Sequence, residues 1–187
     1  MTSRKGQLLI ASRRLVDPNF ARSVVLIVHH DEDGAMGLVL NRPLEVSVAE
    51  ACGESVEAAG GVEQPVHQGG PCPGPLMVLF GPDEQDAEAF DASGEEVVAG
   101  VRFTAERGDI EGLMRGHEGR IKYFANYSGW SADQLESEIT EGSWLLAPAT
   151  ANDVFASDAG QWTKLATRLT LGQWIDPARI PDDPSVN

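Results

Sequence analysis

Apolar runs recur along the chain with the lengths of short strands. Residues 23–30 form a continuous apolar and β-branched run that ends in two histidines, as expected of a strand buried on both faces. The pair Asp33-Gly34 follows as a turn signal, and residues 35–41 form a second apolar run. Together they predict a β-hairpin in which Ile27 pairs with Leu40. Further strands are predicted at residues 7–11, 76–81, 97–104, 120–127 and 143–147.

Capping residues mark the starts of helices. Ser47 is followed three residues later by Glu50, a capping box that opens a predicted helix over residues 47–59. Ser131 and Gln134 form a second box, which opens another helix. Apolar residues at helical spacing predict a third helix at residues 158–171 and a weaker one at residues 109–115.

These elements predict an α+β fold with one largely antiparallel sheet. About seven strands and about four helices alternate only in part, which is typical of α+β rather than α/β proteins. No linker divides residues 1–176, so we expect a single domain. Residues 177–187 are polar and contain three prolines, and we expect this tail to be poorly ordered.

The charge of the chain is strongly negative and unevenly spread. The 187 residues contain 14 Lys and Arg and 29 Asp and Glu, a formal net charge of −15. Residues 1–42 are the exception, with six basic and four acidic side chains. Direct nucleic-acid binding is disfavoured because the rest of the chain would repel a polyanion. The acidic run at residues 83–96 is typical of a solvated loop.

Several classes of protein are excluded or disfavoured by missing signals. No apolar run reaches the ~18 residues of a membrane span, and the N-terminal apolar stretch is too short for a signal peptide, so a cytoplasmic location and no membrane partner are predicted. Cys52 and Cys72 have neither disulfide-framework nor zinc-site spacing. His29 and His30 point to opposite faces of their strand and cannot chelate one metal. We predict no metal and no cofactor, and no nucleophile–base constellation is recognisable.

Four stretches, LLIAS…LVDPNFARSVVLIV, GAMGLVLNRP, HQGGP and GWSADQLESEI, occur in this order between residues 7 and 172. In this combination the sequence resembles the YqgE/AlgH family of small bacterial proteins. The resemblance implies a single-domain α+β fold, a cytoplasmic location and no established enzymatic activity. Some members of the family are labelled transcriptional regulators. Because the chain is so acidic, we interpret any such role as indirect.

Two positions depart from the family pattern, which usually has glycine at both. Asn126 tolerates the left-handed backbone region better than most residues, although less well than glycine. If glycine at this position serves the close approach of a ligand, binding by this chain is weakened. Asp133 is predicted to lie in the first helical turn, where a carboxylate suits the positive end of the helix dipole.

Nine residues at strand ends and around the second capping box are candidates for a ligand site: Asn41, Arg42, Gly69, Gly70, Tyr127, Trp130, Gln134, Glu136 and Glu138. Arg42 precedes Pro43 and is held extended, so that it can offer donors to an anion. Alternatively, it pairs with an acid or with backbone carbonyls. Gly69-Gly70 permits close approach of either a ligand or a crossing strand.

The second capping box and its hydrophobic staple already account for Trp130 and Gln134. That account does not need Glu136 or Glu138, and either carboxylate can act as an acid or base where burial raises its pKa.

Three functions are compatible with this pattern. The first is a non-catalytic small-ligand-binding or indirect regulatory protein, whose groove is formed by the candidate residues. The second is an enzyme for a small anionic substrate, with Arg42 as the clamp and Glu136 or Glu138 as the general base. The third is an acidic interaction module that binds a basic protein partner. The oligomeric state is not indicated.

Overall fold

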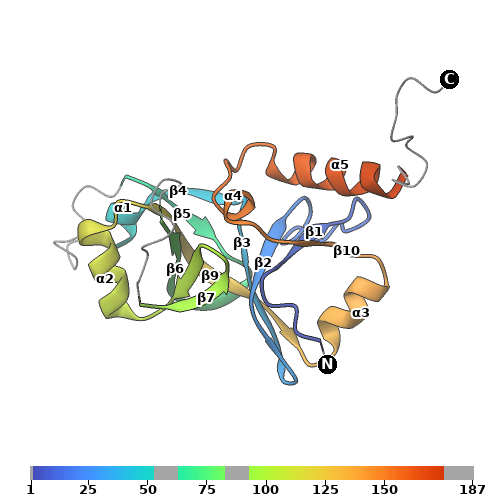
Figure 1. The fold of residues 1–187 in the computed structure, drawn as a ribbon, viewed down its shortest axis with the longest axis horizontal. Coiled ribbons are helices and arrows are strands. Elements are labelled where there is room, and N and C mark those ends of the chain that lie inside the picture. Colours follow the sequence, from blue (N-terminus) through green and yellow to red (C-terminus); the bar gives the residue numbers. More distant parts are fainter. Residues whose placement is uncertain (1, 53–62, 83–92, 175–187) are drawn as a thin grey trace, which may run out of the picture.

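The structure is a computed structural model that describes residues 2–52, 63–82 and 93–174 (Figure 1). Ten strands form one curled sheet: β1 (Gln7–Ala11), β2 (Val24–Asp31), β3 (Gly34–Val39), β4 (Pro43–Ser47), β5 (Pro65–Gln68), β6 (Cys72–Gly81), β7 (Glu95–Val98), β8 (Val101–Thr104), β9 (Arg120–Ser131) and β10 (Trp144–Pro148). The described helices are α1 (Val48–Cys52), α2 (Arg107–Gly116), α3 (Gln134–Thr140), α4 (Ala151–Val154) and α5 (Gln161–Trp174).

The strand order confirms the α+β, largely antiparallel prediction. The main path runs β10-β1-β2-β3-β9-β6-β8-β7, with β5 beside β9 and β4 beside β5. Only the β5–β9 pair is parallel among the pairs of described strands. The strand number exceeds the predicted seven for two reasons. Gly100, at φ +74°, divides the run at residues 97–104 into β7 and β8. β4 is almost wholly exposed and β5 has only four residues, so neither carries an apolar run.

The β2–β3 hairpin forms, but the predicted register is wrong. Asp31 pairs with Gly34, so that the turn residues are Glu32 and Asp33, and Ile27 pairs with Gly37. The Asp31 carboxylate accepts a hydrogen bond from the Asp33 amide and fixes this turn. Gly34 is the first residue of β3 and lies close to neighbouring β9. A Cβ on Gly34 would lie 2.2 Å from the Trp130 carbonyl oxygen, so this position needs glycine for packing and not for the turn.

The helix ends differ from the prediction where the backbone is left-handed. α3 begins at Gln134 because Asp133 has φ +61° and is its N-cap, so Asp133 is not in the first turn. α5 begins at Gln161, after Gly160 at φ +74°, and continues through the predicted stop at Gly172. The Ser47–Glu50 capping box forms as predicted. The rest of the predicted helix at 47–59, most of the acidic run and the tail at 177–187 lie outside the described residues.

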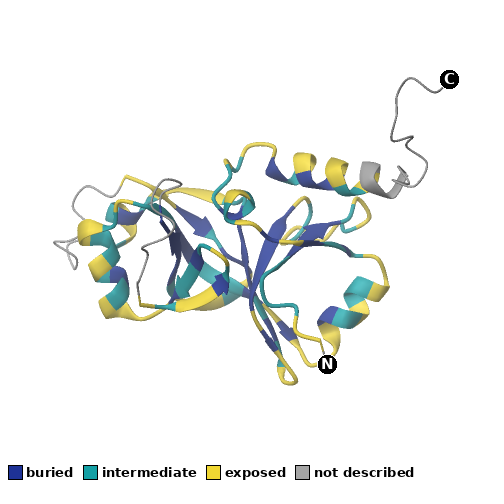
Figure 2. Cartoon of the chain, in the orientation of Figure 1, coloured by how far each residue is buried: buried dark blue, intermediate teal, exposed yellow. Residues whose placement is uncertain are grey.

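The core lies along the middle strands, and the helices cover the faces of the sheet (Figure 2). α5 packs on β1 and β10, and α3 contacts β3, β9 and β10. α2 lies at the other side of the molecule, over a separate core cluster that contains Val78, Phe80 and Tyr123 (Figure 1). The sheet thus carries two helical regions, one with α3 and α5 and one with α2.

Candidate functional site

The candidate residues predicted from the sequence fall into two groups at opposite ends of β3. Asn41 and Arg42 follow the end of β3, and the Arg42 carbonyl accepts a hydrogen bond from the Gln68 amide, which brings Gly69 close. Trp130 pairs with Ala35 at the start of β3. Because β3 has six residues and a strand rises about 3.3 Å per residue, roughly 17 Å separates the two ends. The structure therefore does not join Arg42 and Glu136 in one groove.

Trp130, Gln134 and Glu138 form a hydrogen-bonded clamp that holds α3. Glu138 Oε2 accepts from Trp130 Nε1 at 3.0 Å and from Trp144 Nε1 at 2.8 Å. Gln134 Nε2 donates to the other oxygen, Oε1, at 3.0 Å. Both indoles are nearly fully buried, and Phe20 packs against both rings. The Glu138 carboxylate is thus engaged on both oxygens.

Half of the predicted capping box at Ser131 forms. Gln134 Oε1 accepts from the Ser131 amide at 3.1 Å and from its hydroxyl at 3.2 Å. The reciprocal bond from the helix backbone to Ser131 does not form, because the left-handed Asp133 starts the helix later.

Glu136 faces the N-terminal segment. Its Oε1 lies 3.5 Å from His30 Nε2 and 3.9 Å from Arg4 Nε. His30 Nδ1 accepts from the Arg4 amide at 2.8 Å, so the neutral ring carries its proton on Nε2, toward Glu136. The His30 side chain is 1% exposed. This arrangement fixes the segment before β1 against β2 and α3.

Gly69 and Gly70 lie where strands pass close together. A Cβ on Gly69 would lie 2.3 Å from the Asn126 carbonyl oxygen, and one on Gly70 would lie 2.3 Å from the Tyr127 backbone. Tyr127 itself pairs with Cys72 in the β6–β9 ladder. Close strand packing therefore explains both glycines. Asn126 has φ +64°, in the left-handed region that glycine adopts freely and that asparagine tolerates better than most residues.

Asn41 and Arg42 tie β3 to the segment before β2. Asn41 Oδ1 accepts from the Val24 amide at 2.9 Å, and its Nδ2 donates to the Arg22 carbonyl at 3.0 Å. Arg42 Nη2 donates to the Ala21 carbonyl at 3.2 Å. Partial burial lowers the pKa of Arg42, and the charge of Asp17 opposes this effect. Arginine remains charged at neutral pH even so.

Ala21 belongs to the wall of a hollow that the sequence pattern does not indicate. We call it the arginine hollow. It has a volume of about 520 Å³ and is lined by Ser12, Arg13, Leu15, Val16, Ala21, Arg22 and Trp162. The Arg22 guanidinium lies 5.9 Å from the centroid of the Trp162 ring. Arg22 has φ +58°, a conformation that is uncommon for a residue with a side chain. The sequence signal for this site was the excess of basic over acidic side chains in residues 1–42.

A second unpredicted cluster joins the start of α5 to the sheet. Lys122 Nζ donates to Asp158 Oδ1 at 2.7 Å and to the Leu40 carbonyl at 3.0 Å. His67 Nε2 lies 3.1 Å from both Asp158 oxygens. Burial lowers the pKa of Lys122, although Asp158 opposes the shift. Burial, followed by the charge of Lys122, lowers the pKa of His67. The cluster is mostly buried and connects β5, β9 and the segment before α5. We therefore interpret it as a structural tie.

Within residues 2–52, 63–82 and 93–174, no three His, Cys, Asp or Glu side chains are grouped to hold a metal ion. Both cysteines are free thiols. No helix in these ranges is long and apolar enough to cross a membrane.

The fold and the site define a small α+β protein with hollows on its surface and a hydrogen-bonded clamp on α3. The AlgH-like family profile matches residues 8–173, and the chain belongs to this family. The resemblance predicted from the four sequence stretches is therefore confirmed.

Relatives align along nearly their whole length. A UPF0301 protein of Chlorobaculum tepidum is 32% identical over 187 residues, which cover 97% of this chain and 95% of that protein. A UPF0301 protein of Streptomyces coelicolor is 35% identical over 191 residues, which cover 100% of this chain and 97% of that protein.

Two solved structures share the fold. The crystal structure of a Corynebacterium diphtheriae protein has a TM-score of 0.72 and 26% identity, over 90% of this chain and 88% of that chain. The solution structure of the AlgH protein from Pseudomonas aeruginosa has a TM-score of 0.68 and 25% identity, over 94% and 97% of the two chains. None of these names states a ligand or a reaction.

Proposed function

We propose that this protein is a non-catalytic binding protein for a small anion, and that the arginine hollow is its binding site. The observation that carries this proposal is the grouping of Arg13 and Arg22 around one hollow, with Arg42 directly behind its Ala21 wall. The chain as a whole carries a net charge of −15. Guanidinium groups bind carboxylates and phosphates through paired hydrogen bonds, so their local excess favours an anionic ligand.

The geometry of Arg22 supports the same proposal. Its left-handed backbone is a local strain, and strained residues are concentrated at ligand sites. The exposed Arg22 side chain rests over the Trp162 ring, which gives the guanidinium a defined position. The volume of about 520 Å³ lies in the range of small-molecule sites.

The enzyme alternative has less support. It requires Arg42 and Glu136 or Glu138 to contact one small substrate, whereas they lie at opposite ends of β3. Both oxygens of Glu138 are already hydrogen-bonded. The interaction-module alternative and an indirect regulatory role remain predictions. A pull-down of a basic protein partner whose recovery falls with increasing salt would favour the interaction module.

A thermal-shift screen with inorganic phosphate, pyrophosphate and citrate tests the proposal. An anion at 100 times its Kd adds about 2.7 kcal/mol to the free energy of unfolding, which is a rise of roughly 5–11 °C in Tm for a chain of this size. We expect Arg22→Gln and Arg13→Gln to lose the shift while the Tm without ligand changes little. Arg14→Gln is the matched control, because Arg14 is exposed, adjacent in sequence and outside the lining.

Arg42→Ala separates a binding role from a structural one. Loss of the anion shift with little change in the ligand-free Tm assigns Arg42 to binding, and a large fall in the ligand-free Tm assigns it to the tie with Ala21. The proposal fails if no anion raises the Tm, or if Arg14→Gln abolishes the shift as Arg22→Gln does.

A further inference from the structure

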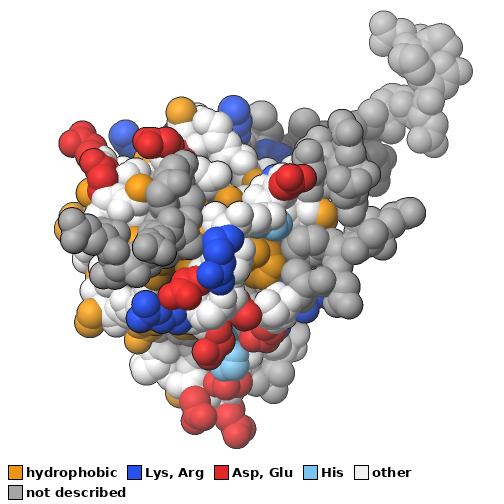
Figure 3. Space-filling model, turned by 90° about the vertical axis from the view of Figure 1, so that its left-hand side faces the viewer, with side chains coloured by type: hydrophobic (Ala, Val, Ile, Leu, Met, Phe, Trp, Pro, Cys, Tyr) orange, Lys and Arg blue, Asp and Glu red, His pale blue; other side chains and the backbone are white. Residues whose placement is uncertain are grey.

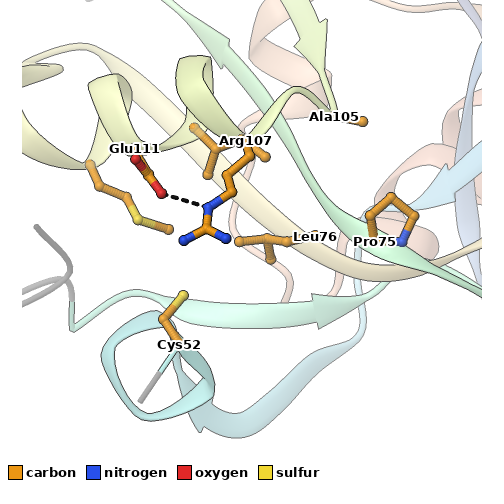
Figure 4. A pocket seen from close by; sticks show the side chains of 8 residues that line it. Cys52, Pro75, Leu76, Ala105, Arg107 and Glu111 are labelled. Carbon is orange, nitrogen blue, oxygen red and sulfur yellow. Dashed lines mark hydrogen bonds and ion pairs between the residues drawn. The ribbon is translucent and has the colours of Figure 1, made fainter. Parts of the chain in front are cut away.

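A second hollow lies at the opposite side of the molecule, beneath α2. We call it the apolar hollow. It has a volume of about 310 Å³ and is bounded by α1, β6 and α2, with Cys52, Pro75, Leu76, Ala105, Arg107, Ile110, Glu111 and Met114 as its lining (Figure 4). The space-filling view of this side of the molecule shows hydrophobic side chains between charged ones (Figure 3). The proposed anion site does not involve any of these residues.

The walls of the apolar hollow favour hydrocarbon. Ile110 is 5% exposed, and Leu76 and Met114 are half-buried on the same core cluster. Burial raises the pKa of the Cys52 thiol, which is therefore neutral at pH 7 and behaves as a small apolar group. The Cys52 sulfur points into the hollow (Figure 4). An apolar ligand body would be surrounded by these groups and removed from water.

The mouth of the hollow carries a guanidinium with free donors. Arg107 Nε donates to Glu111 Oε1 at 2.7 Å. Within the part of the chain that the structure describes, no partner of the two Nη groups of Arg107 is seen; Figure 4 shows the guanidinium beside Leu76, on the side of the hollow that faces Cys52, and the side chain is 80% exposed. Arg107 is also the first residue of α2, whose N-cap Glu106 makes no side-chain capping bond. The helix dipole and the free Nη groups favour a negative charge here, and the carboxylate of Asp109 in the first turn opposes it.

α2 has unfilled space along its glycine positions. It contains Gly108, Gly112 and Gly116, and a Cβ at any of them would meet nothing within 4 Å. Glycine inside a helix lowers its stability relative to alanine. A further hollow of about 420 Å³ lies on the other side of Met114, so the helix has space on both sides.

We propose that the apolar hollow binds a small monocarboxylate with an unbranched hydrocarbon body, its carboxylate on Arg107 and its chain against Ile110, Met114 and Leu76. At about 30 Å³ per non-hydrogen atom, a value taken from the volume share of liquid water, 310 Å³ holds about ten such atoms. Octanoate has this size and is the probe for the test.

Protection of Cys52 from alkylation tests the proposal directly. The native protein is treated with N-ethylmaleimide, with and without octanoate, and labelling of each cysteine is followed by peptide mass spectrometry. Cys72 is the internal control, because it lies in β6 next to Tyr127 and outside the lining. We expect saturating octanoate to slow labelling of Cys52 at least fivefold and to leave Cys72 unchanged. Equal protection of both thiols, or of neither, overturns the proposal.

The role of the carboxylate is tested with calorimetry, which does not depend on thiol labelling. We expect Arg107→Gln to weaken octanoate binding about tenfold and Arg115→Gln, on the same helix but outside the lining, to change it less than twofold. Octanol should bind the native protein about as weakly as octanoate binds Arg107→Gln. Absence of saturable octanoate binding, or equal effects of the two variants, overturns the proposal. Arg22→Gln should leave octanoate binding unchanged, so this result stands or fails separately from the anion site.

Discussion

Two short helices on the same sheet, α3 and α2, are held in opposite ways. α3 has seven residues and is fixed by Glu138, whose carboxylate accepts from two buried indoles. α2 has ten residues, contains three glycines, and buries only Ile110 fully. Hollows lie on both sides of α2. Polar contacts to buried side chains thus hold α3, whereas α2 rests mainly on apolar contacts and has unfilled space on both sides.

The largest expected effect concerns the tie between α5 and the sheet. Asp158→Ala leaves the buried ammonium of Lys122, 10% exposed, without its counter-charge. We expect the free energy of unfolding to fall by about 3 kcal/mol, the lower end for a broken buried pair because Asp158 is partly exposed. Urea unfolding measures the change. The double variant Lys122→Met with Asp158→Leu should recover part of the loss, and a loss below about 1 kcal/mol for Asp158→Ala would contradict this account.

The next largest loss of stability is expected when the clamp on α3 is removed. Glu138→Ala leaves the Trp130 and Trp144 indole N–H groups without their acceptor, and each buried unpaired group costs about 1–3 kcal/mol. Because Glu138 is only half-buried, we expect a total loss of about 2–3 kcal/mol in urea unfolding. Glu141→Ala, at the exposed end of the same helix, is the control and should stay within about 0.5 kcal/mol. Similar losses in the two variants would remove the distinction between the helices.

The pH dependence of unfolding should reflect His67. Burial and Lys122 lower its pKa in the folded state, so the unfolded chain binds the proton more readily. The free energy of unfolding should therefore fall as the pH decreases below about 6.5, the ordinary pKa of histidine, and be unaffected by this group above it. The measurement is a series of urea unfolding curves between pH 5 and 8. His67→Gln should have a smaller slope in the acidic part, and an unchanged slope would contradict the prediction.

The smallest expected effects come from glycine-to-alanine variants, one in α2 and one directly after α3. Gly112→Ala in α2 should add about 0.5–1 kcal/mol to the free energy of unfolding, because the new methyl group meets nothing and alanine favours the helix. Gly142→Ala, after α3, should instead lose about 1 kcal/mol, because Gly142 has φ +79°. Thermal unfolding measures both. Hydrogen exchange of the α2 amides should also be slower in Gly112→Ala. If the free energy of unfolding changed with the same sign in both variants, the contrast between the two helices would be contradicted.

Local sequence patterns predicted most elements but not their exact pairing. The run at residues 23–30 predicted β2 and the box at Ser47 predicted the start of α1, because strand burial and capping are local properties. The hairpin register was wrong because Gly34 serves the approach of β9, a strand about a hundred residues away. β4 was missed because its side chains are exposed and, among the described strands, it pairs with β5 alone.

The candidate site was less predictable than the fold. Arg42 and Glu136 were predicted to share one groove because both lie near the ends of elements, yet the sequence does not reveal that they lie at opposite ends of β3. Trp162 and Arg22, 140 positions apart, meet only when α5 packs on β1. Lys122 stands in a strand-like run, and a lysine among apolar residues was the one local signal for the buried tie.

The sequence by itself determined the α+β class, the family, the Ser47–Glu50 cap and the acidic character, since each depends on neighbouring residues or on composition. Only the tertiary structure decided which side chains share a surface. The clamp, the tie and both hollows join residues that are distant along the chain, and such contacts arise from the curvature and strand order of the sheet. For this reason the chemistry proposed here rests on Arg22 and Arg107 in their folded surroundings.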